Sequence, residues 1–160
     1  MMIPVEELLL KNGRITEGQF GRAKALGLKR PGRRLSELLV ELGYVREEEI
    51  LSCLAEDGGL RIVDLDQYPV DPEASRRISG LFALRYRLLP IGFQEGCLLT
   101  AVSAPPKQEV KEELEAAAGM SPRFVLALER QISDWTDAVY GSQELRQAAA
   151  DVDLEAAFGA

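Results

Sequence analysis

The positively charged side chains at positions 29–34 are the strongest candidates for chemistry in the chain. Lys29, Arg30 and Arg33 form a basic cluster that continues into Arg34. Guanidinium groups pair with phosphate oxygens through two parallel hydrogen bonds, so the cluster could bind a small anion such as a nucleotide phosphate. The alternative is a solvated loop between helices. The formal charge of the whole chain is −7, which argues against general nucleic-acid binding.

Groups that commonly perform catalysis are scarce. The chain has no histidine, which removes the commonest general base and the commonest metal ligand together. Cys53 and Cys97 fall in a helical and a strand pattern, and we expect two buried thiols rather than a redox pair. No Gly-x-x-x-x-Gly-Lys-Ser/Thr phosphate loop occurs, so ATP hydrolysis is not expected. We therefore expect no catalytic residue, no metal site and no cofactor.

One pair of acidic residues allows two interpretations. Asp64 and Asp66 stand close together at the end of a predicted strand, as paired carboxylates for acid–base catalysis would. Aspartates beside Tyr68-Pro69 are also typical turn formers, because their side chains bond the backbone two residues on. The turn is the favoured interpretation.

The elements that position the basic cluster come from a repeat. Residues 7–26 and 37–56 show one pattern at an offset of 30, most clearly where ELLLKNGRI aligns with ELLVELGYV. In each copy a glycine stands just past the apolar residues, where a left-handed residue closes a helix. Thr16 and Gln19 then predict a capping box, and Glu47 to Glu49 suit the start of a helix after Arg46. Each copy is a predicted helix pair, and the two pairs must pack together to bury their apolar faces.

A second part of different pattern follows Gly58-Gly59. Strands are predicted at 60–65, 87–93, 97–102 and 123–128, and helices at 71–78, 80–86, 107–118 and 129–140. A hairpin with glycine at its turn joins the middle strands, and Pro90 restricts the first of these to a sheet edge or to a position where its missing N–H is not needed for strand pairing. The fold class is therefore α+β or α/β, a four-helix repeat followed by a small β-α-α-β-β-α-β-α unit. We expect a helical subdomain at 1–57, an α/β subdomain at 58–140 and a flexible tail at 141–160.

Composition is that of an ordinary globular protein, with 46% hydrophobic and 28% charged residues. No apolar run approaches the roughly 20 residues of a membrane span, and residues 1–4 do not begin a signal peptide. We expect a cytoplasmic protein without membrane insertion.

Several stretches together resemble a known family. Arg34–Val45, followed by Ile50, Leu54 and Asp57, is similar to the repeated motif of the N-terminal domain of type II secretion and type IV pilus assembly ATPases. The later stretches agree in order: Leu65–Ala74, Arg85–Ile91 and Leu99–Pro105. The resemblance covers roughly residues 4–140 and is specific as a set.

The resemblance implies a ligand. MshE-type domains of that family bind cyclic di-GMP through a motif that begins Arg-Leu-Gly, ends in Gln and occurs twice. In this chain the matching positions make a candidate nucleotide site of Arg34, Leu35, Leu38, Leu39, Gly43 and Asp57. The motif is degenerate, because Ser36 replaces Gly, Asp57 replaces Gln, Gly27 takes the Gln place of the first copy, and 4–6 read Pro-Val-Glu. We expect cyclic di-GMP to bind weakly or not at all, since carboxylates oppose a dianion.

Two functions follow from the resemblance. The first is a non-enzymatic regulatory or adaptor module that docks on cytoplasmic or inner-membrane proteins of a secretion or pilus assembly. The second is a sensor of cyclic di-GMP or another nucleotide with a degenerate motif.

Overall fold

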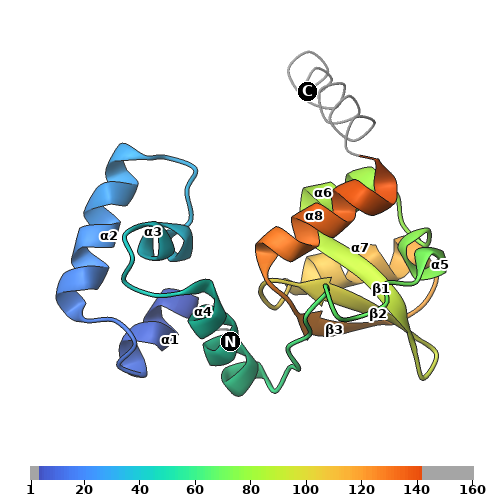
Figure 1. Ribbon diagram of the computed structural model, residues 1–160, viewed down its shortest axis with the longest axis horizontal. Helices are drawn as coiled ribbons and strands as arrows, with labels where there is room; N and C mark the ends of the chain where they lie inside the picture. The colour runs from blue at the N-terminus through green and yellow to red at the C-terminus, as the bar shows by residue number, and fades with distance from the viewer. Residues whose placement is uncertain (1–3, 142–160) are drawn as a thin grey trace, which may run out of the picture. The chain divides into compact units, whose positions relative to one another are not determined.

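The computed structural model describes residues 4–141, which divide into two compact units between Gly59 and Leu60 (Figure 1). Each unit is described by itself. Of the tail expected at 141–160, all but Gly141 lies outside the described residues. Within residues 4–141, no helix combines the length and the apolar character needed to cross a membrane.

The first unit contains the predicted repeat of helix pairs. Its described helices are α1 (Val5–Lys11), α2 (Glu17–Lys29), α3 (Leu35–Glu41) and α4 (Glu47–Gly58). Helices α1 and α3 end in the same way, because the glycines that follow them, Gly13 and Gly43, have φ of 71° and 77°. The amides of Arg14 and Tyr44 then reach back to carbonyls in the last turns, at 2.8 and 3.0 Å. Both copies therefore satisfy orphan helix carbonyls by one device.

The starts of the second helices also match the expectation. The Thr16 hydroxyl accepts from the Gln19 amide at 3.1 Å, and the Gln19 side chain accepts from the Thr16 amide at 2.9 Å. At α4 the Glu49 carboxylate accepts from the Arg46 amide at 3.3 Å. These bonds satisfy backbone donors that a helix start leaves without an intrahelical partner.

The helices pack chiefly across the two copies rather than within one. Helix α3 lies against α2, and α1 lies against α4. The core of the unit consists of buried apolar side chains from both copies: Leu8, Leu9, Ile15, Ala23, Leu38, Leu39, Val45, Ile50, Leu51, Cys53 and Leu54. The exchange of partners is what buries the apolar face of each pair.

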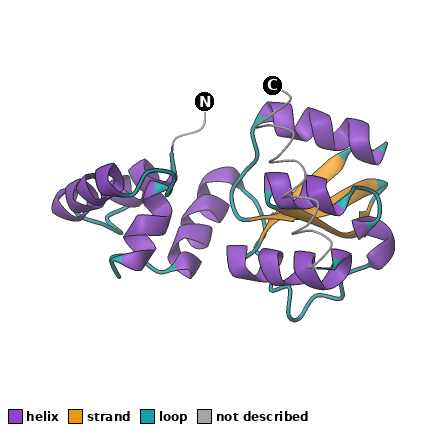
Figure 2. Ribbon diagram, turned by 90° about the horizontal axis from the view of Figure 1, so that it is seen from above, coloured by secondary structure: helices purple, strands orange, loops and turns teal. Residues whose placement is uncertain are grey.

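The second unit is a small mixed sheet covered by helices. Its described elements are α5 (Pro72–Ser75), α6 (Gly80–Tyr86), β1 (Leu88–Gln94), β2 (Cys97–Val102), α7 (Gln108–Ala118), β3 (Pro122–Leu126) and α8 (Glu129–Tyr140). The described strands are ordered β1-β2-β3, with β1 antiparallel and β3 parallel to β2. The sheet runs between α7 on one face and α8 on the other (Figure 2). This explains why five consecutive residues of β2, Leu98–Val102, are buried. The predicted α+β class is confirmed.

Three element boundaries differ from the expectation. The predicted strand 60–65 is only an isolated parallel bridge between Ile62 and Leu126. It stops because Asp64 begins a turn, with the Gln67 amide donating to its carbonyl at 3.0 Å. The predicted helix 71–78 is reduced to the four residues of α5, and β3 ends at Leu126 rather than 128.

The β1 edge of the sheet is covered by α5 and α8. The Ser75 hydroxyl donates to the Pro90 carbonyl at 2.8 Å, and the Tyr140 hydroxyl donates to the Ser75 carbonyl at 2.5 Å. Burial raises the pKa of the Tyr140 phenol, so it remains a proton donor. Strand β1 lies at the sheet edge, which is the first of the two placements that Pro90 allows, and the contacts block further strand pairing there.

Candidate functional site on the helical unit

An open hollow of about 590 Å³ lies between α2 and α3. Residues at the end of α2, in the following loop and at the start of α3 line it: Lys24, Ala25, Gly27, Leu28, Arg33, Leu35 and Leu38. A Cβ atom at Gly27 would lie 3.4 Å from Leu38 Cδ1, so Gly27 and Leu38 bring the two helices together at the hollow. The lining is apolar apart from two cationic side chains.

The basic cluster beside the hollow is held by two glutamates of α3. Arg33 pairs with Glu37 at 2.9 Å and with Glu41 at 3.2 Å, and Arg34 pairs with Glu37 at 2.7 Å. Arg30 also pairs with Glu41. The glutamates stand four residues apart, so both face the loop from one side of α3. Arg33 and Arg34 are therefore already paired with carboxylates, and an incoming anion would have to compete with them.

The ion pairs with Arg34 and Arg33 lower the pKa of the Glu37 carboxyl. Partial burial by itself raises the pKa of Glu37, but the hydrogen bonds and charges of Arg34 and then Arg33 outweigh it. The result is a pKa below the ordinary value of 4.5. Glu37 is therefore a carboxylate near neutral pH and competes with other anions for both arginines.

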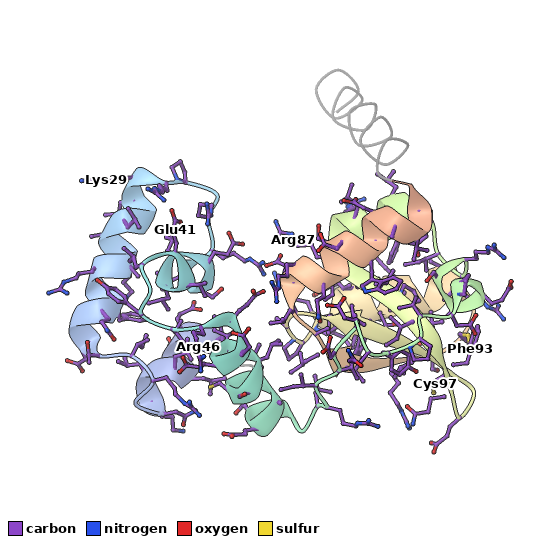
Figure 3. All side chains as sticks on the ribbon, in the orientation of Figure 1. Lys29, Glu41, Arg46, Arg87, Phe93 and Cys97 are labelled. Atoms are coloured by element: carbon purple, nitrogen blue, oxygen red, sulfur yellow. The ribbon has the colours of Figure 1, made fainter. Side chains whose placement is uncertain are left out.

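Two lysines complete the charge around the hollow. Lys24 Nζ lies 4.3 Å from the centroid of the Phe20 ring. Lys29 extends outward from the end of α2, whereas Glu41 lies on α3 (Figure 3). Within residues 4–141, neither lysine forms an ion pair.

The residues predicted as a nucleotide site fall in different places. Leu35 and Leu38 of α3 line the hollow together with Arg33 of the basic cluster, and Arg34 precedes Leu35 at the N-cap of α3. Leu39 is fully buried in the core. Gly43 closes α3, and Asp57 is exposed in the last turn of α4.

The structure does not bring Asp57 to Arg34. The end of α4 and the α2–α3 loop lie at opposite ends of the helical unit (Figure 1). The physical reason is the exchange of partners, because α3 packs on α2 of the other copy. The residue that lines the hollow is Gly27, which is the equivalent of Asp57 at the offset of 30.

Other hollow residues were not predicted. Lys24, Ala25 and Leu28 come from the last turns of α2. The available signal was Leu28, a large apolar residue next to Lys29 and Arg30. Its side chain is 88% exposed.

In the second unit, Asp64 and Asp66 have structural hydrogen-bond partners. The Gln131 side-chain amide donates to Asp64 Oδ1 at 2.8 Å and to Asp66 Oδ2 at 3.2 Å, and its oxygen accepts from the Leu65 amide at 3.3 Å. The Asp66 amide donates to Asp64 Oδ1 at 3.0 Å. The favoured turn interpretation accounts for both carboxylates. Across the described part of the chain, no group of three Cys, Asp or Glu side chains is placed to hold a metal.

The cysteines are free thiols in different settings. Cys53 is buried in α4 and its sulfur accepts from the Asn12 side-chain amide at 3.2 Å. Cys97 begins β2 and is half-buried, which differs from the expected burial of both, because it pairs with Gln94 at the end of the hairpin.

Comparison with known proteins identifies the family. The model of the MshEN domain matches residues 58–145. The chain belongs to the MshEN domain family. The resemblance found in the sequence is thereby confirmed, and the matched residues include the whole described sheet unit.

Solved structures extend the similarity to the helical unit. The structure of MshE with cdg, cyclic di-GMP, is 31% identical with a TM-score of 0.73, over 87% of this chain and 100% of that chain. The N-terminal domain of XpsE in one crystal form is 27% identical with a TM-score of 0.68, over 86% and 94% of the two chains. The MshEN chain therefore has the size and fold of these domains.

Curated relatives are much longer proteins. The type IV pilus assembly ATPase PilB of Thermus thermophilus is 34% identical over 123 residues, and that of Myxococcus xanthus is 22% identical over 137 residues. Bacteriophage adsorption protein B of Escherichia coli K12 is 26% identical over 129 residues. These alignments cover 76%, 86% and 81% of this chain but only 13%, 24% and 17% of the relatives. The same domain is thus similar to parts of proteins with different names.

Proposed function

We propose that this MshEN domain is a non-enzymatic docking module that works in the cytoplasm, on inner-membrane assembly proteins of a type II secretion system or type IV pilus. The observation that carries the proposal is its alignment with almost the whole N-terminal domain of XpsE. The PilB relatives support the same setting. The sequence contains no phosphate loop, which supports a role separate from ATP hydrolysis.

Binding to assembly proteins tests the docking function. Purified protein would be presented to the cytoplasmic segments of inner-membrane secretion and pilus proteins, with binding followed by biolayer interferometry. We expect one segment to bind with a dissociation constant of about 10 µM or lower, as specific transient interfaces do. Failure of every segment to bind would contradict the docking function.

An activity assay tests the non-enzymatic part separately. The sequence contains no phosphate loop, the element with which P-loop ATPases hold the β- and γ-phosphates of ATP. We expect no magnesium-dependent phosphate release above the blank. Release that follows the purified protein through chromatography would show that this part of the proposal is wrong.

A second candidate function is weak sensing of cyclic di-GMP. It is favoured by the similarity to MshE with cdg and by arginines beside an apolar hollow. The carboxylates of Glu37 and Glu41 already engage these arginines, and Gly27 offers no amide side chain. Calorimetry with cyclic di-GMP should therefore give a dissociation constant weaker than about 1 µM. A submicromolar constant would favour the sensor over the docking module.

A further inference from the structure

We propose that the α2–α3 hollow docks an amphipathic helical segment of a partner protein, with a large apolar side chain in the hollow and carboxylates around it. The inference rests on the docking function above and adds its surface and the chemistry of its partner. Three observations carry it: the exposure of Leu28, the charge around the hollow and the absence of side-chain hydrogen-bond acceptors from its lining.

Leu28 supplies the apolar anchor point. A single exposed leucine is ordinary, but this one is 88% exposed and lines a hollow together with Ala25, Leu35 and Leu38. An apolar side chain inserted there would remove both its own surface and that of Leu28 from water. The volume of about 590 Å³ leaves room for such an insertion.

The charge around the hollow selects an acidic partner. Residues 24–41 carry five Lys or Arg and two Glu, a net charge of +3 within a chain of −7. Lys24 lines the hollow and Lys29 stands beside it, and within residues 4–141 neither is in an ion pair. Carboxylates of a docked segment can meet these ammonium groups without displacing Glu37 or Glu41.

The lining favours a peptide over a nucleotide. None of its seven residues has an amide, hydroxyl or carboxylate side chain. Lys24 and Arg33 can donate to the acceptors of a base, but the N–H groups of a base would find no side-chain acceptor in the lining, and leaving them unpaired is costly. An apolar side chain has no such requirement. A helix that presents apolar residues at i and i+4 places them on one face, as this groove between two helices requires.

Two synthetic helical peptides provide the test. Each is about 16 residues long, roughly four turns, with Leu and Phe on one face and either Glu or Lys elsewhere. The full chain is labelled with ¹⁵N and titrated with each peptide. We expect the Glu peptide to shift amide resonances of residues 24–38 and the Lys peptide to leave them unchanged. Raising the salt concentration from about 50 to about 500 mM should lower the affinity for the Glu peptide several-fold.

Two substitutions with matched controls locate the site. Leu28→Gln should lower the affinity for the Glu peptide at least about tenfold, as the loss of a central apolar contact in an interface does. Leu42→Gln, at a leucine 37% exposed outside the hollow, should not. Lys24→Glu should also lower the affinity for the Glu peptide, whereas Lys11→Glu on α1 should leave that affinity unchanged. All four positions are exposed, so circular dichroism should show unchanged folding.

The outcomes separate this inference from the docking function. If an assembly protein binds but Leu28→Gln has no effect on it, docking stands and the hollow is not its surface. If neither peptide shifts residues 24–38, the inference is overturned. If cyclic di-GMP shifts them with submicromolar affinity and the Glu peptide does not compete, the hollow is a nucleotide site instead.

Discussion

The guanidinium groups of Arg33 and Arg34 are the side chains with the clearest capacity to bind an anion, and α3 has already supplied them with carboxylates. An incoming phosphate must compete with Glu37 in a site only partly removed from water. Exposed ion pairs contribute only about 0–1 kcal/mol each, so this competition weakens anion binding without abolishing it. The pairs therefore explain at the residue scale why a weak nucleotide site is expected.

Arg34 should carry whatever affinity for cyclic di-GMP exists. Its guanidinium is at the start of α3 beside the hollow, so Arg34→Ala should abolish residual binding in calorimetry. Arg76→Ala is the matched control, because Arg76 is an exposed arginine of the second unit paired with Glu73 at 2.8 Å. Equal loss in both variants would show that binding follows overall charge rather than this site.

Replacing Glu37 tests the ion-pair network through its pH dependence. The folded pKa of Glu37 lies below 4.5, so its contribution to stability is present above 4.5 and is lost as pH falls through the folded pKa. Glu37→Gln should lower the free energy of unfolding by less than about 1 kcal/mol at pH 7, because the pairs are exposed. The difference from wild type should vanish near about pH 2, measured by urea unfolding.

A control locates the effect of Glu37. Glu56→Gln removes an exposed carboxylate of α4, and it should change stability by less than about 0.5 kcal/mol at either pH. A pH-independent loss in Glu37→Gln would mean that the carboxylate acts through packing rather than charge.

At the scale of elements, local signals predicted what local interactions determine. The glycines after α1 and α3, the Thr16–Gln19 capping box and the Asp71-Pro72 helix start are each set by residues within one turn. The segment 60–65 was wrongly predicted as a strand. Leu65 is in the core and Val63 packs against it, but Asp64 turns the chain after one bridge. Periodicity carries no information about that competition.

The side chain of Gln131 should stabilise the packing of α8 against the turn at Asp64. It is buried and bonds Asp64, Asp66 and the Leu65 amide. Gln131→Leu should lower the free energy of unfolding by about 1–3 kcal/mol, because the backbone amide of buried Leu65 loses its acceptor. Gln108→Leu, at an exposed helical glutamine, should change it by less than about 0.5 kcal/mol in the same urea titration. Equal effects would show that the buried bonds contribute little.

The β1–β2 hairpin offers a stabilising substitution. Its loop is Glu95-Gly96, with φ of 52° and 77°, so both residues are left-handed. Asn tolerates this conformation better than Glu and favours such two-residue turns. Glu95→Asn should raise the free energy of unfolding by about 0.5–1 kcal/mol despite losing the exposed pair with Arg123. Glu95→Ala, which loses the same pair without gaining turn preference, is the control in thermal unfolding, and an equal result for both would refute the turn argument.

At the scale of the whole chain, the repeat predicted the helices but not which faces meet. The two copies could pack pair by pair or exchange partners, and both arrangements bury the same apolar residues. Only the structure shows that α3 lies on α2, which brings Leu28 and Gly27 to Leu35 and leaves Asp57 elsewhere. The α3 side of the candidate site could be predicted from the motif in the second copy. The α2 side could not, because it comes from the first copy and depends on how the two copies pack.

The two units should differ in their ability to fold alone. In the helical unit α1 and α3 have seven residues each, well below the roughly 12–15 at which isolated helices become stable. A unit of about 60 residues also buries a small fraction of its surface. The second unit has a sheet with both faces covered and a larger core around Leu89, Ile91 and Leu99. Residues 60–140 should therefore melt cooperatively by circular dichroism, and residues 1–59 should remain loosely ordered with poor amide dispersion. A cooperative transition in the 1–59 fragment would show instead that the exchanged packing of the repeat is sufficient for an independent fold.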